Sequence, residues 1–140
     1  MGQAFVIIGR WEEGLDCMRA VSDDGPVPAS VAYWTGLIHH LRGDLRAALQ
    51  AYDRWTPCPD DDPAGVSLVH SMRASTRWLL GQGDQARTDA TTALQLARRS
   101  GDPSALAGAH TALAMIATGD GDRRANDVHD RLALEFAQAA

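Results

Sequence analysis

The spacing of glycine constrains the fold of this chain more than any other feature. Four glycines interrupt helix-like stretches at regular intervals: Gly9, Gly43, Gly83 and Gly121. The differences between successive positions are 34 (43 minus 9), 40 (83 minus 43) and 38 (121 minus 83). A period of this size is typical of arrays in which one helical hairpin is repeated. The sequence therefore predicts several copies of a single two-helix unit.

Proline marks the helix starts with nearly the same period. Pro63 follows Asp62 and Pro103 follows Asp102, while Pro28 marks the corresponding point in an earlier copy. Aspartate is a good N-cap, and proline is favoured at the first helical position because its missing N–H is not needed there. Each proline is therefore expected to begin a helix and each glycine to end one. The predicted hairpins cover about 1–23, 28–56, 63–100 and 103–139.

Apolar residues recur three and four positions apart within these segments. Val31, Trp34 and Ile38 share one face of a helix, and alanines such as Ala86 and Ala90 form a stripe that lets helices approach closely. We expect an all-α fold, a right-handed array of antiparallel helix hairpins (an α-solenoid) of about 3.5 repeats, as one domain over residues 1–140. Because the first helix is short and the last has no polar cap, we expect a segment of a longer protein.

Composition excludes several classes of function. A net charge of -5 disfavours direct nucleic-acid binding, which normally uses a basic surface. The two cysteines, Cys17 and Cys58, are too far apart to indicate a disulfide framework, which fits a reducing cytoplasm. The N-terminal apolar run, residues 4–8, is too short for a signal peptide or a membrane span.

The stretch from Gly36 to Trp55 resembles the tetratricopeptide repeat (TPR) family. Gly36 matches the glycine where the two helices pack, Ala48 matches the small residue at their crossing, and Tyr52 matches the aromatic residue four positions later. The family pattern has Trp, Leu and Tyr at three further positions, which here hold Ala32, Thr35 and His39. The resemblance implies a TPR-like repeat scaffold that binds a protein or a peptide.

The later units are similar to the longer, degenerate repeats of bacterial LuxR-type transcriptional regulators with a MalT-like sensor region. Residues 93–114, ALQLARRSGDPSALAGAHTALA, carry this similarity. It implies a non-catalytic sensor or interaction segment of such a regulator, which binds an effector or a partner protein. No helix-turn-helix motif and no nucleotide-binding loop occurs among these residues.

The resemblance also implies where a partner would bind. In the family, the ligand groove runs along the first helix of each hairpin, on the side away from the second helix. The residues at such positions are Tyr33, Leu37, His40, His70, Arg73 and Arg77. Their chemistry suits an acidic peptide or a carboxylate effector, through charge-assisted hydrogen bonds. The alternative is that Arg73 and Arg77 are ordinary solvated charges on a helix surface.

A second hypothesis is a small helical metal-binding protein or enzyme. Its site would be assembled across repeats from His40, His70, His110 and the two cysteines. No metal-ligand spacing supports it, because adjacent residues such as His39 and His40 point about 100° apart on a helix. No nucleophile, phosphate-loop or dinucleotide motif occurs either. We therefore expect neither catalysis nor a cofactor, and we regard self-association through uncovered terminal helices as possible.

Overall fold

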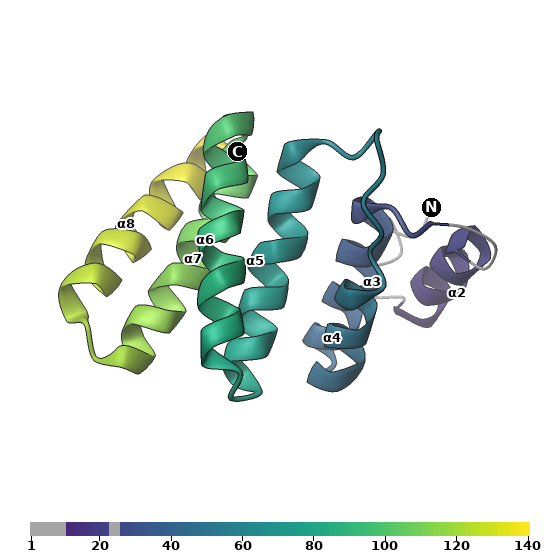
Figure 1. Ribbon diagram of the computed structural model, residues 1–140, viewed down its shortest axis with the longest axis horizontal. Coiled ribbons are helices and arrows are strands. Elements are labelled where there is room, and N and C mark those ends of the chain that lie inside the picture. Colours follow the sequence, from purple (N-terminus) through teal and green to yellow (C-terminus); the bar gives the residue numbers. More distant parts are fainter. Residues whose placement is uncertain (1–10, 23–25) are drawn as a thin grey trace. The chain divides into compact units, whose positions relative to one another are not determined.

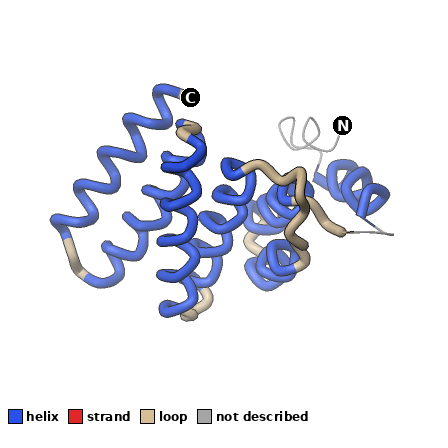
Figure 2. The backbone as a smooth tube through the Cα atoms, turned by 45° about the horizontal axis from the view of Figure 1, so that its top comes forward, coloured by secondary structure: helices blue, strands red, loops and turns tan. Residues whose placement is uncertain are grey.

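The computed structural model describes residues 11–22 and 26–140, which form helices joined by turns and loops and contain no strand (Figure 1). Short loops join successive helices into antiparallel hairpins (Figure 2). The all-α class of a TPR-like repeat array is confirmed. The predicted first helix, before Gly9, lies outside the described residues. The helices are α2 (Trp11–Ser22), α3 (Ala29–Leu41), α4 (Leu45–Asp53), α5 (Pro63–Leu79), α6 (Gly83–Ser100), α7 (Pro103–Asp120) and α8 (Arg123–Ala139).

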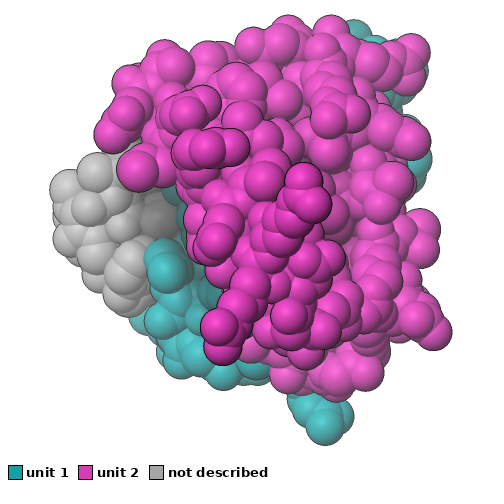
Figure 3. Space-filling model, turned by 90° about the vertical axis from the view of Figure 1, so that its left-hand side faces the viewer, with its two compact units in different colours: residues 1–61 teal, residues 62–140 magenta. Residues whose placement is uncertain are grey.

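The chain divides into two compact units, which Figure 3 distinguishes by colour. Unit 1 is Met1–Asp61 and contains α2, α3 and α4, whereas unit 2 is Asp62–Ala140 and contains α5 to α8. Each unit has a hydrophobic core of its own. The expectation of a single domain over residues 1–140 stays a prediction.

Aspartate caps begin the helices as the sequence predicts. The Asp62 carboxylate accepts a hydrogen bond from the Gly65 amide at 2.9 Å, and the Asp102 carboxylate accepts one from Ala105 at 2.8 Å. In both cases the following proline is the first helical residue. These caps satisfy amide groups that the helix itself leaves without an acceptor.

Four glycines of the described residues end helices in the left-handed conformation, with φ of 80° at Gly43, 81° at Gly81, 68° at Gly101 and 74° at Gly121. At the second of these turns, Gly81 donates to the Trp78 carbonyl at 3.0 Å and the next residue donates to the Arg77 carbonyl at 2.8 Å. This is the Schellman arrangement, which favours glycine because it has no Cβ. The sequence prediction of a turn at Gly83 was wrong, since the turn is centred on Gly81 and Gly83 is already the first residue of α6.

Unit 1 is built around the contact between Gly36 and Tyr52. A Cβ atom added at Gly36 would lie 2.1 Å from Cε1 of the Tyr52 ring, so only glycine lets this ring pack against α3. Tyr52 and Ala48 are fully buried on the facing side of α4. These are the three residues that match the TPR pattern, and they hold the hairpin together as that pattern requires.

The loop after α4 is fixed by one carboxylate. Helix α4 ends at Asp53, slightly before the predicted end at Trp55. Asp61 accepts hydrogen bonds from the Trp55 indole at 2.9 Å, from the Cys58 amide at 3.0 Å and from the Ala29 amide at 3.0 Å. In this acidic loop, Asp61 therefore holds the loop in place by hydrogen bonds, and Asp62 caps α5.

Alanine dominates the core of unit 2, as its stripe in the sequence indicates. Ala86, Ala90, Ala93 and Ala97 of α6 are all fully buried. The large exception is Trp78, whose ring lies so close to α7 that a Cβ atom at Gly119 would be 2.1 Å from it. Within the described residues, no helix is both long and apolar enough to cross a membrane.

Candidate functional site

The most unusual polar group of the described residues is the carboxylate of Asp89, on α6. Asp89 is only 3% exposed, and three side chains of α5 converge on it. Arg73 reaches both of its oxygens, with Nη2 at 2.8 Å from Oδ1 and Nε at 3.1 Å from Oδ2. Arg77 Nη1 lies 2.6 Å from Oδ2, and His70 Nδ1 lies 2.9 Å from Oδ1. We call these four residues the Asp89 cluster.

Helix geometry explains why the cluster forms. His70, Arg73 and Arg77 follow one another at intervals of three and four, so they lie on one face of α5. Helix α6 packs against α5 after a short turn at Gly81, which places the middle of α6 beside that face. A fork-shaped guanidinium pairs well with both oxygens of a carboxylate, as Arg73 does here.

The neighbours of Asp89 keep it ionised although it is buried. Burial by itself raises the pKa of a carboxyl, but the hydrogen bonds from His70 and Arg73 and the charges of Arg73 and Arg77 outweigh it. The result is a pKa of Asp89 of about 2. At neutral pH the ionised carboxylate of Asp89 is thus shared by two guanidinium groups.

The cluster changes the interpretation of two predicted site residues. Arg73 and Arg77 have side chains only 16% and 19% exposed, so they are not ordinary solvated charges. The sequence predicted that His70, Arg73 and Arg77 lie on the side of this helix away from the second helix, which was wrong, because all three reach Asp89 of α6. Asp89 was not predicted as a site residue. The available signal was a carboxylate directly beside the buried alanine stripe of α6, where a charge is rarely placed without a partner.

The other predicted site residues belong to unit 1. Tyr33, Leu37 and His40 are half-buried on α3, and the Tyr33 ring meets Trp34 edge-on at a centroid distance of 5.2 Å. Burial raises the pKa of Tyr33 and lowers the pKa of His40, so both side chains favour their neutral forms. Because they lie in a different unit from the Asp89 cluster, they form a separate group.

A second buried polar pair occupies the matching positions of the next hairpin. His110 and His129 follow His70 and Asp89 at the same interval (110 minus 70 and 129 minus 89 are both 40), and their Nδ1 atoms are 3.0 Å apart. Burial, then the nearby His129 and Arg98, lower the pKa of His110. His110 is thus a buried, hydrogen-bonded histidine of the core. The position of Asp89 in one hairpin is therefore held by a histidine in the next, and the ion cluster is replaced by a pair of histidines.

The residues proposed for a metal site do not come together in the described part of the chain. No three His, Cys, Asp or Glu side chains there lie close enough to share an ion. His110 pairs with His129, and the Cys58 thiol donates to the Thr56 carbonyl at 3.2 Å. The side chain of Cys17 lies outside the described residues. Of the two site hypotheses, only the Asp89 cluster has an assembled geometry.

Comparison with known proteins supports the same scaffold. Residues 1–63 match the Tetratricopeptide repeat family. This match covers the α3–α4 hairpin, in which Gly36, Ala48 and Tyr52 pack as the TPR pattern requires. No curated protein matches the chain. The TPR-like character of the repeat scaffold rests on the match and on this packing together.

Proposed function

We propose that the chain is a non-catalytic docking segment that binds an acidic stretch of a partner protein through the Asp89 cluster. TPR repeats generally mediate protein–protein interaction, which favours a scaffold over an enzyme. One observation carries the proposal: a single buried carboxylate holds two arginine side chains in fixed positions on one face of α5. Arginines held in advance lose less conformational freedom when a second carboxylate binds.

Three residues of α3 are proposed to make a second contact with the partner protein. Tyr33, Leu37 and His40 combine an aromatic ring, an aliphatic side chain and an imidazole on one helix. Such a group suits an apolar or aromatic residue of a partner, because a neutral and partly buried surface binds charge poorly. In this proposal the Asp89 cluster binds acidic residues of the partner. The α3 residues Tyr33, Leu37 and His40 bind apolar residues of the partner independently of that cluster.

We further propose that the segment serves as the sensor or interaction region of a bacterial transcriptional regulator in the cytoplasm. The similarity of residues 93–114 to the repeats of LuxR-type regulators supports this context. The net charge of -5 is consistent with a segment that leaves DNA binding to another region. The partner is then a protein or effector that presents carboxylates.

Fluorescence anisotropy with labelled peptides tests the proposal. The full chain is titrated against fluorescein-labelled hexaglutamate and hexaglutamine, at low and at high salt. We expect saturable binding of hexaglutamate only, weakened by salt because exposed charges are screened. The Arg77→Gln variant should bind at least fivefold more weakly, whereas Arg99→Gln, which removes an exposed arginine of α6, should bind like the parent chain. Equal binding of the two peptides would refute the proposal.

A folding control separates loss of the site from loss of structure. Arg77→Gln also weakens a buried network, so its helix content and its thermal unfolding are measured alongside binding. Arg77→Lys keeps the charge but loses the fork that reaches Asp89. We expect binding to fall in the order parent, Arg77→Lys, Arg77→Gln among folded samples. If the folded Gln variant binds as tightly as the parent, the arginine has no part in docking.

A further inference from the structure

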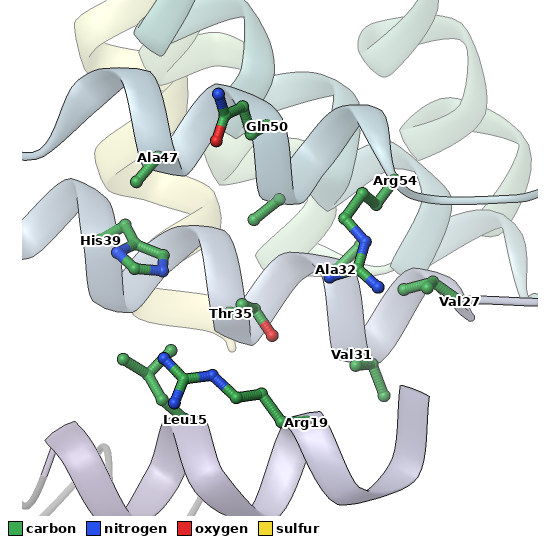
Figure 4. A pocket seen from close by; sticks show the side chains of 11 residues that line it. Leu15, Arg19, Val27, Val31, Ala32, Thr35, His39, Ala47, Gln50 and Arg54 are labelled. Atoms are coloured by element: carbon green, nitrogen blue, oxygen red, sulfur yellow. The ribbon is translucent and has the colours of Figure 1, made fainter. Parts of the chain in front are cut away.

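Unit 1 contains a cavity of about 270 Å³ between α2, α3 and α4 (Figure 4). Its α3 wall includes Ala32, Thr35 and His39. These are the three positions at which the TPR pattern has Trp, Leu and Tyr, the large residues that would occupy the space between neighbouring helices. The cavity therefore lies where three large side chains of the pattern are replaced by smaller or polar ones.

The replaced residues leave a floor that is mainly apolar. Leu15 of α2 is 2% exposed, Val27 is 7% exposed, and Val31 and Ala51 complete this surface. An apolar cavity of this size that stayed unfilled would cost stability, because its walls lose packing contacts. The space equals that of about nine water molecules at about 30 Å³ each, which suits a small organic molecule.

The polar side chains around the cavity are cationic or neutral. Figure 4 shows the guanidinium groups of Arg19, which lies on α2 beside Leu15, and of Arg54, the residue that follows α4, at different ends of the lining. Arg19 also pairs with Asp16 at 3.1 Å, but both side chains are exposed, and such a pair is weak. Among the described residues that line the cavity, none is Asp or Glu. The lining therefore favours an anion.

We propose that this cavity binds a small organic carboxylate, with its apolar body against Leu15 and Val31 and its carboxylate at Arg54. His39 contributes a hydrogen-bonding group and not a charge, because burial lowers its pKa. Thr35 and Gln50 offer further hydrogen-bonding groups at the wall. The site goes beyond peptide docking on α5 and shares no residue with it, so either can fail alone.

NMR titration of the isotopically labelled full chain with cyclohexanecarboxylate tests the site. We expect saturable shifts at the amides of Thr35, His39 and Arg54, and at least tenfold weaker binding of the neutral analogue cyclohexylmethanol. Arg54→Gln should weaken carboxylate binding at least fivefold. The matched control Arg46→Gln, which removes an exposed arginine of α4 outside the cavity, should bind like the parent chain.

A cavity-filling variant separates a binding site from a packing defect. Thr35→Leu restores the family residue, so it should abolish binding while its melting temperature stays the same or rises. Absence of saturable shifts in the parent chain would overturn the proposal, as would unchanged binding in folded Thr35→Leu. Equal affinities for the acid and the alcohol would overturn the assignment of a carboxylate.

Discussion

Replacing Asp89 with asparagine is the most informative single change in unit 2. The substitution keeps the size of the side chain but removes the charge that Arg73, Arg77 and His70 share. In the parent chain these partners hold the pKa of Asp89 at about 2, below its ordinary value of 3.8. The ionised carboxylate is therefore bound more favourably in the folded than in the unfolded state.

The pKa difference sets the size of the effect. A difference of one in pKa corresponds to about 1.4 kcal/mol, so ionised Asp89 contributes roughly 2 kcal/mol to the free energy of unfolding. Because the folded pKa is the lower one, this contribution is complete well above pH 4 and is lost as the pH falls towards 2. Asp89→Asn also leaves two guanidinium groups without their carboxylate. Removing one partner of a buried ion pair costs about 3–5 kcal/mol, which sets the upper bound.

Urea unfolding at pH 7 and pH 3 measures the effect, with hydrogen exchange of α6 amides to report on unit 2 alone. We expect Asp89→Asn to lose roughly 2–5 kcal/mol at pH 7. The difference from the parent chain should shrink by about 1 kcal/mol at pH 3, where roughly half of the ionisation contribution is gone. The control Asp130→Asn, at an exposed position of α8, should change little. A loss below about 1 kcal/mol at pH 7, or one independent of pH, would refute the reasoning.

Three further perturbations test the packing, the caps and the buried histidine. Gly36→Ala should destabilise unit 1 by roughly 1–3 kcal/mol in urea unfolding, because its Cβ would overlap the tyrosine ring beside it; parent-like stability would contradict this packing. Asp102→Ala should cost about 1 kcal/mol through its lost cap, and an unchanged melting temperature would count against the cap. His110 should titrate below pH 6.5 by NMR, because burial and then His129 and Arg98 disfavour its charged form. Stability should accordingly fall as the pH drops below about 6.5, and a normal pKa would contradict the burial.

Features set by local chemistry could be predicted from the sequence. The Asp-Pro starts of α5 and α7 were correct, because cap and proline act within one turn of helix. The packing of Gly36 was predictable because the TPR pattern includes it. The turn near Gly83 was misplaced because two glycines, at 81 and 83, lie close together. In the structure, Gly81 adopts the positive φ, and the Schellman hydrogen bonds that end α5 form there.

The functional groups depend on contacts that the sequence does not specify. Asp89 and Arg77 belong to different helices, and only the pairing of α5 with α6 brings Oδ2 and Nη1 to 2.6 Å. The cavity in unit 1 also depends on contacts that the sequence does not specify. Thr35 and His39 were recognised as departures from the TPR pattern, yet neighbouring side chains can fill such space. Whether a cavity remains depends on the packing of three helices, which the periodicity of one helix cannot reveal.

In the proposed function, the Asp89 cluster presents prearranged arginines to acidic partners. Its most direct test is an NMR titration of the labelled full chain with unlabelled hexaglutamate, observing the Arg73 and Arg77 side-chain Nε–H signals. We predict saturable shifts of these signals that hexaglutamine does not cause and that high salt suppresses. Signals that stay unchanged while other residues bind the peptide would contradict the claim.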